Sequence, residues 1–127
     1  MLGRESVQFV AVDLPKPIST NNLWKPVKRG KHAYMIASKE YLDWQALAGL
    51  TLNTQRPGLV EGPYALTITV SSKWRGDLDN CIKAASDVLQ SQGVIENDKH
   101  AQEITIRRGG CEGMNVLVVS TRSKEAE

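Results

Sequence analysis

Residues 64–93 place the tightest constraint on the fold, because a strand pattern is followed at once by a helix pattern. The first seven residues, Tyr-Ala-Leu-Thr-Ile-Thr-Val, alternate in polarity, which is typical of a β-strand with one buried face. Over residues 80–92 apolar side chains recur at three- and four-residue steps, and Gly93 stands where a helix normally ends. Only a short connection joins the predicted strand to the predicted helix.

The rest of the chain adds four predicted elements. Residues 7–12 indicate a strand buried on both faces, and residues 103–107 and 116–119 indicate two further strands. Ser38 is a favourable N-cap for a helix over residues 39–53. The apolar face predicted for that helix consists of Tyr41, Leu42, Ala46, Leu47, Gly49 and Leu50. The order β, α, β, α, β, β predicts an α/β fold with a mixed sheet.

A chain of 127 residues fits a single domain over residues 1–127, with a polar tail from about residue 120 that we expect to fray. Cys81 and Cys111 are too few for a disulfide framework or a zinc site, so both are expected to be reduced thiols. We expect no contact with a membrane, because no apolar run approaches roughly 20 residues and the N-terminus lacks the layout of a signal peptide. The protein should therefore be soluble and cytoplasmic.

Three carboxylates flank the helix predicted over residues 80–92. Asp77 and Asp79 stand one residue apart at its start, and Asp98 follows its end. Clusters of oxygen ligands suit Mg²⁺ or Mn²⁺, and these ions usually meet phosphate. Asp79 also fits an N-cap and Asp98 a turn. The three can share one ion only if the chain after Gly93 runs back beside the first pair.

Known carboxylate motifs narrow the chemistry. A calcium-binding EF-hand needs Gly and Glu where this chain has Ile82 and Val88. A phosphotransferase of the haloacid dehalogenase type needs a hydroxyl where Cys81 stands, so a metal-dependent nuclease is the best match. Lys83 lies four residues after Asp79, on the same side of a helix, and could steady a scissile phosphate or form a salt bridge to Asp87.

Residues 14–39 carry six Lys or Arg residues and no acidic residue, with aromatic side chains between them. Such a segment suits the DNA backbone, although a solvated loop is the alternative. The candidates for backbone contacts are Lys16, Lys25, Lys28, Arg29, Lys31, Lys73, Arg107 and Arg108. With a carboxylate cluster beside it, this segment favours an enzyme that acts on nucleic acid.

Residues 77–83 form the string Asp-Leu-Asp-Asn-x-x-Lys, with Asp77, Leu78, Asp79, Asn80 and Lys83. In this string, and in Asp-Val-Leu at residues 87–89, Gly-Val at 93–94 and the acidic region at 97–98, the chain resembles the RusA family of Holliday junction resolvases. Weaker likeness covers Pro-Ile-Ser-Thr-Asn-Asn at residues 17–22 and the start of the helix at residues 38–44. The family usually carries Asp-Asp where this chain has Asn97 and Asp98.

The resemblance implies a homodimer that needs Mg²⁺ or Mn²⁺ and resolves four-way DNA junctions by paired symmetric nicks. The implied metal ligands are Asp77, Asp79 and Asp98, with Lys83 as a further catalytic residue and a metal-activated water as nucleophile. Trp74 and Arg75 become candidates for contacting bases at the open centre of a junction, although Trp74 could instead pack in the protein. Proteins of this family come from bacteria, phages or prophages. The alternative function is a non-catalytic protein that binds branched DNA.

Overall fold

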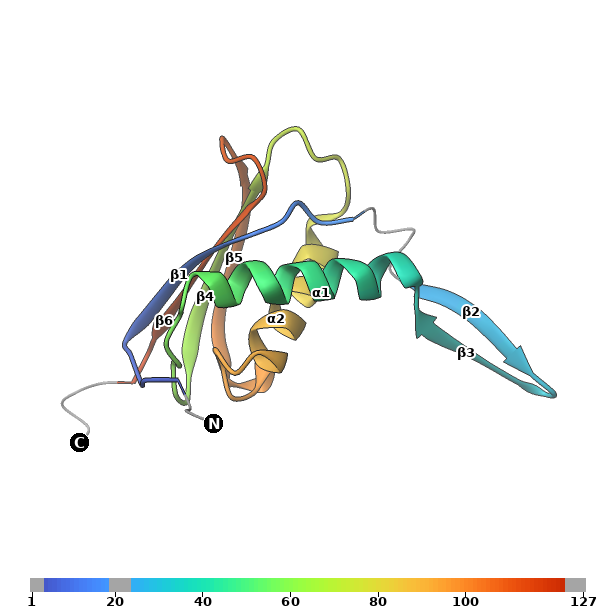
Figure 1. Ribbon diagram of the computed structural model, residues 1–127, viewed down its shortest axis with the longest axis horizontal. Helices are drawn as coiled ribbons and strands as arrows, with labels where there is room; N and C mark the ends of the chain where they lie inside the picture. Colours follow the sequence, from blue (N-terminus) through green and yellow to red (C-terminus); the bar gives the residue numbers. More distant parts are fainter. Residues whose placement is uncertain (1–3, 19–23, 123–127) are drawn as a thin grey trace.

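The computed structural model describes residues 4–18 and 24–122, so part of the segment at residues 17–22 and most of the predicted tail lie outside the described residues. Figure 1 shows two helices covering one face of a sheet, and a hairpin that projects from the body. The elements are β1 (Phe9–Leu14), β2 (Trp24–Arg29), β3 (His32–Ala37), α1 (Lys39–Thr54), β4 (Tyr64–Ser71), α2 (Leu78–Ser91), the 3-10 turn η2 (Asp98–His100), β5 (Ala101–Gly109) and β6 (Met114–Ser120). The predicted α/β fold with a mixed sheet is confirmed.

The main sheet has the strand order β1-β6-β4-β5. β6 pairs antiparallel with β1 and β4, whereas β4 and β5 are parallel. Parallel neighbours need a crossover connection, and α2 supplies it. The start of α2 therefore lies at the carboxyl end of β4, which is where ligands usually bind in sheets of this kind.

The core lies between the helices and one face of the sheet. β4 contributes Leu66, Ile68 and Val70, each at most 1% exposed, as its alternation predicts. α2 contributes Val88 and Leu89. Because helices cover only this face, the other face of the sheet carries exposed side chains.

The prediction that the first strand is buried on both faces is wrong. β1 is an edge strand that pairs only with β6, and its side chains alternate between exposed and buried. Val10 and Val12 point into the core, while Phe9 is 62% exposed on the uncovered face. Residues 7–12 are apolar on both faces of the strand, but only one of these faces is covered by helices.

The segment before α1, where the sequence predicted neither a helix nor a strand, forms the β2–β3 hairpin. Its turn contains Gly30 in the left-handed region, with φ of 60°. Pro26 lies within β2 opposite Met35. A proline is tolerated there because a two-stranded hairpin leaves the outer side of each strand unpaired.

Helix α1 begins as predicted, because the Ser38 Oγ accepts a hydrogen bond of 3.0 Å from the Tyr41 N–H. Its buried face matches the predicted one only in part. Tyr41 and Gly49 are buried as predicted, and Trp44 and Leu52 are buried as well. Leu42, Leu47 and Leu50 are 53%, 54% and 68% exposed, and Ala46 is also exposed. No helix among the described residues is long and apolar enough to span a membrane.

Candidate active site at the start of helix α2

The loop between β4 and α2 is anchored on β5. Arg108 donates hydrogen bonds to the carbonyls of Trp74 and Gly76, the latter at 2.8 Å, and its guanidinium carbon lies 5.8 Å from the centre of the Trp74 ring. Trp74 is only 6% exposed, so the packing alternative describes its position in this chain. A Cβ at Gly76 would lie 2.2 Å from the Trp74 ring, which explains a glycine there. The loop therefore has a defined path into the helix.

The two carboxylates of the motif lie where this loop enters α2. Helix α2 begins at Leu78, so Asp77 takes the N-cap position that the sequence suggested for Asp79, and Asp79 lies in the first turn. The Asp77 side chain makes no capping hydrogen bond, although its carbonyl accepts one of 3.3 Å from the Asn80 N–H. Both residues are exposed. Within the described residues neither carboxylate has a hydrogen bond or an ion pair, so both are free to bind a ligand.

Cys81 stands one turn into α2 and is fully buried. Burial raises the pKa of its thiol to about 11, with a smaller opposing effect from Arg108. Its Sγ lies 3.8 Å from the Asp77 carbonyl. Cys81 and Cys111 are both free cysteines, and a protonated, buried thiol is a poor nucleophile.

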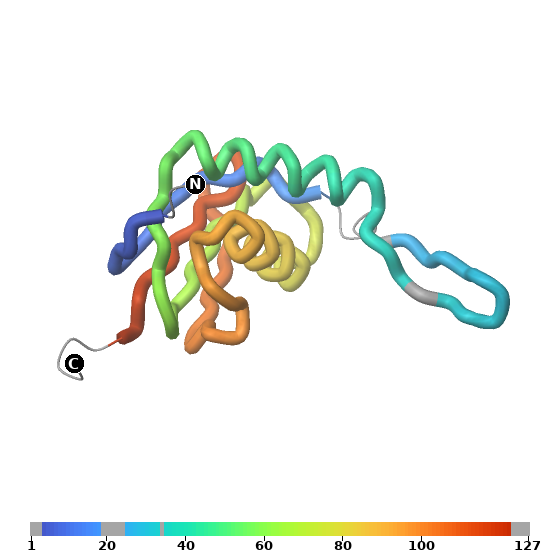
Figure 2. Tube along the Cα trace, turned by 60° about the horizontal axis from the view of Figure 1, so that its bottom comes forward, coloured from blue at the N-terminus to red at the C-terminus, as the bar shows by residue number. Residues whose placement is uncertain are grey.

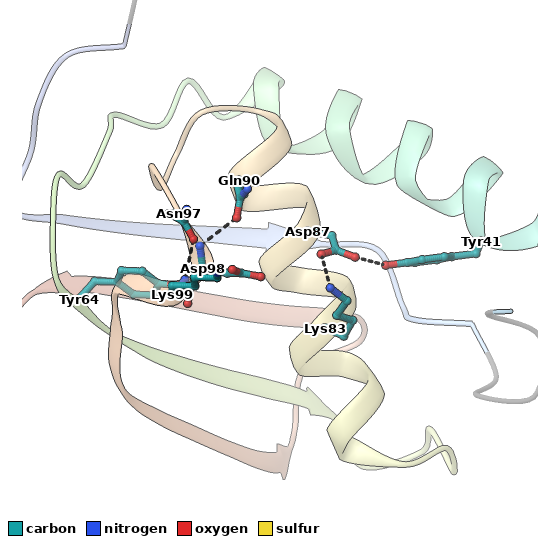
Figure 3. A network of polar contacts seen from close by, with 8 residues as sticks. All are labelled: Tyr41, Tyr64, Lys83, Asp87, Gln90, Asn97, Asp98 and Lys99. Atoms are coloured by element: carbon teal, nitrogen blue, oxygen red, sulfur yellow. Dashed lines mark hydrogen bonds and ion pairs between the residues drawn. The ribbon is translucent and has the colours of Figure 1, made fainter. Parts of the chain in front are cut away.

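Lys83 follows Asp79 by one helical turn and forms the salt bridge that the sequence offered as its alternative role. Its Nζ lies 3.2 Å from Asp87 Oδ1, and the Tyr41 hydroxyl donates a hydrogen bond of 2.9 Å to Asp87 Oδ2 (Figure 3). Burial, followed by the charge of Asp87, raises the pKa of Tyr41. The salt bridge to Asp87 restrains the Lys83 side chain, which is still 54% exposed. A ligand can therefore reach its ammonium group.

Asp98 lies at the other end of α2. Its backbone N–H donates a hydrogen bond of 2.9 Å to the Gln90 side chain, and the Tyr64 hydroxyl lies 3.5 Å from its carbonyl (Figure 3). Burial, together with the charge of Asp98, raises the pKa of Tyr64. The Asn97 side chain accepts a hydrogen bond of 2.9 Å from the Lys99 N–H and so caps η2, a role that Asp also performs.

One chain therefore does not bring the three carboxylates together. Helix α2 has 14 residues and is about 20 Å long, and Asp98 lies beside its last turns rather than its first. The return of the chain after Gly93 beside the first pair does not occur, because Ile95 bridges to Val60 at the far end of the sheet. Among the described residues no group of three or more His, Cys, Asp or Glu side chains is placed to hold a metal ion.

Most of the predicted DNA contacts lie on exposed surfaces. Lys25, Lys28, Arg29 and Lys31 are exposed on the β2–β3 hairpin, which Figure 2 shows extending away from the body of the protein. The other exposed candidates are Lys16, Lys73 and Arg75 near the β4–α2 loop and Arg107 and Arg108 on β5. Lys16 and Lys73 line a surface hollow of about 460 Å³. No sequence pattern indicates the anchoring role of Arg108, because this role depends on the pairing of β4 with β5.

No curated protein matches the chain, but a family model described as endodeoxyribonuclease RusA matches residues 15–119. The match spans all the elements from β2 to β5 and includes Asp77, Asp79 and Asp98. The chain therefore belongs to the RusA family of endodeoxyribonucleases, the Holliday junction resolvases that act on branched DNA.

Proposed function

We propose that this protein resolves four-way DNA junctions by paired symmetric nicks and that a divalent metal ion, Mg²⁺ or Mn²⁺, is required. The observation that carries the proposal is the pair of carboxylates Asp77 and Asp79 at the carboxyl end of a parallel strand, where neither has a partner among the described residues. The chain that carries them belongs to a family of endodeoxyribonucleases. Oxygen ligands of this kind are those that Mg²⁺ prefers.

The donor chemistry of the carboxylates fits a divalent ion, but their placement within one chain fits only in part. Asp77 and Asp79 lie together, whereas Asp98 is at the far end of α2. Asp77 and Asp79 would hold such an ion, which would supply Lewis-acid chemistry at the scissile phosphate. Lys83 supplies a fixed positive charge one turn from Asp79, held by Asp87, and it would offset charge on the phosphate.

The hairpin is the part of the chain best suited to hold the DNA arms. Its four cations are exposed, and none of them has an ion pair among the described residues. Cations on a projecting strand pair can follow a phosphate backbone without reading its sequence. Lys16 and Lys73 near the start of α2 would bind phosphates closer to the cut. This arrangement favours recognition of DNA shape over base sequence.

A homodimer is the simplest assembly for the proposed reaction. A four-way junction has approximate two-fold symmetry, and resolution needs two matched cuts. An isologous pair of chains supplies two equivalent sites with that symmetry. We expect the protein to be encoded by a bacterium, a phage or a prophage. It would act in the cytoplasm, where such junctions arise.

The decisive experiment incubates the purified protein with a labelled four-way junction in Mg²⁺ and, separately, in EDTA. We expect paired nicks in Mg²⁺ alone and no cutting of a linear duplex of the same sequence. Asp79→Asn should abolish cutting and retain junction binding, whereas Asp43→Asn, which alters an exposed carboxylate paired with Lys39, should change neither. Binding without cutting in both Mg²⁺ and Mn²⁺ would favour the non-catalytic alternative, and wild-type cutting by Asp79→Asn would exclude the proposed site.

A further inference from the structure

Lys83 stands midway between two carboxylates of the same helix. Asp79 lies four residues before it and Asp87 four residues after it, so the lysine is placed to reach either one. On an isolated helix the acidic residue on the N-terminal side is the better partner. The structure shows the opposite choice, since Lys83 Nζ lies 3.2 Å from Asp87 Oδ1 and Asp79 has no ion pair among the described residues. A contact outside α2 therefore selects Asp87.

The Tyr41 hydroxyl on α1 supplies this contact. It donates a hydrogen bond of 2.9 Å to Asp87 Oδ2, while Oδ1 of the same carboxylate faces Lys83 (Figure 3). Tyr41 is itself well fixed, because its side chain is buried and its ring stacks on that of Trp44, with 6.2 Å between the ring centres. A carboxylate that is bonded through one oxygen to a fixed group has its other oxygen aimed in one direction.

An ion pair on α1 shows how much the tyrosine changes. Lys39 and Asp43 are also four residues apart, with 2.9 Å between Nζ and Oδ2, but their side chains are 88% and 67% exposed. The side chains of Lys83 and Asp87 are 54% and 26% exposed. An exposed pair loses most of its gain to the entropy of two mobile side chains and to solvent. A carboxylate that Tyr41 has already ordered has less entropy left to lose when it binds a lysine.

We propose that Tyr41 and Asp87 are positioning residues, which hold the Lys83 ammonium beside the scissile phosphate. The inference rests on the proposed nuclease function. An ammonium group has three donors, so a bond to Asp87 leaves two for phosphate oxygens. The Tyr41 hydrogen bond and the Lys83 charge together offset the negative charge of Asp87, which would otherwise repel a phosphate. The same contact draws Lys83 away from Asp79 and leaves that carboxylate open to a ligand.

A fixed charge beside the reacting phosphate acts on the chemical step more than on binding. Most of the affinity for DNA comes from many phosphate contacts, to which one lysine adds little. A cation that is already in place when charge develops needs no rearrangement, and displacing such a group by about 1 Å costs up to about a hundredfold in rate. Loss of the positioning residues should therefore lower the nicking rate at saturating junction and leave junction affinity nearly unchanged.

The first test measures single-turnover nicking in a double-mutant cycle. Asp87→Asn keeps an oxygen that accepts the Tyr41 hydrogen bond but loses the charge that binds Lys83. We expect the nicking rate to fall about tenfold and the junction Kd to change by less than about twofold. Asp43→Asn is the matched control from the exposed pair and should change neither. In a Lys83→Met background, Asp87→Asn should have no further effect, because it acts through the lysine. An unchanged or raised rate in Asp87→Asn, or an equal fall in the Lys83→Met background, would overturn the proposal.

A second test does not depend on cutting. NMR relaxation of the lysine side-chain ammonium groups measures how ordered each group is on the ps–ns timescale. In the wild type the Lys83 ammonium should be more ordered than that of Lys39. Tyr41→Phe keeps the ring but removes the hydroxyl, and should make Lys83 about as mobile as Lys39. Equal order of the two lysines in the wild type would exclude the positioning role, even for a protein that fails to cut DNA. Absence of cutting by the wild type would instead refute the proposed function.

Discussion

Arg108 should be a positioning residue for the start of α2, and Arg108→Met tests this role. The guanidinium joins β5 to the loop that carries Asp77, through the carbonyls of Trp74 and Gly76 and the face of the Trp74 ring. Methionine keeps much of the aliphatic stem but removes both donors and the charge. The variant should therefore loosen the loop without opening the core beneath it.

The size of the effect follows from the contacts. A hydrogen bond from a charged donor contributes about 1.5–3 kcal/mol when it is buried, and a cation–π contact about 0.5–1 kcal/mol at an exposed site. Arg108 is exposed, and water replaces part of what is lost, so we expect a net loss of about 1–2 kcal/mol in the free energy of unfolding. For a domain of this size that loss lowers Tm by about 3–8 °C.

Urea unfolding followed by circular dichroism measures the stability, and single-turnover nicking at saturating junction measures the chemistry. A loss of this size leaves the protein folded at 25 °C, so a fall of about tenfold in nicking rate would report the displaced carboxylate rather than unfolding. Arg107→Met is the matched control for stability, since Arg107 has no hydrogen bond or ion pair among the described residues. Equal unfolding midpoints for the two variants would refute the anchoring role.

Two further predictions concern other parts of the chain. Tyr41→Phe removes the hydrogen bond of 2.9 Å to Asp87 and should lower the free energy of unfolding by about 1 kcal/mol in urea. Because the pKa of Tyr41 is raised above 10.0 in the native state, the unfolded state loses that proton first, so wild-type stability should fall above pH 10 more than that of Tyr41→Phe. A parallel pH dependence of the two proteins would contradict this linkage. Replacing Lys28 and Arg29 by Gln should weaken junction binding and reduce the slope of log K against log salt by about 1 per lost phosphate contact, whereas Lys39→Gln should leave the slope unchanged.

The strand β4 and the helix α2 could be predicted because their patterns are local and consistent. Alternation over residues 64–70 and a glycine after the helix each correspond to one structural requirement. Gly93 indeed takes the left-handed conformation expected after a helix end, with φ of 77°. Patterns of this kind need no knowledge of the rest of the fold.

The predictions for the N-terminal third failed where the local structure depends on which other elements pack against it. A proline within β2 normally argues against a strand, yet an isolated hairpin has free edges that accept it. Helix α1 carries apolar residues around much of its circumference, so its sequence does not single out the face that packs on the sheet. Leu42 and Leu50 were assigned to the core and are exposed, and an assembly that covers them would reconcile the pattern with the structure.

The candidate site, too, could be predicted only in part. The chemistry of Asp77, Asp79 and Asp98 can be inferred from residue type and motif, but their meeting point depends on the path of the chain after Gly93. That path places Asp98 in the loop before β5, and β5 must begin beside Tyr64 to pair in parallel with β4. A parallel crossover returns the chain to the starting end of the first strand, so a residue placed just before the second strand lies at the opposite end from one placed just after the first. In this fold the two parts of the motif therefore lie at opposite ends of α2 within one chain.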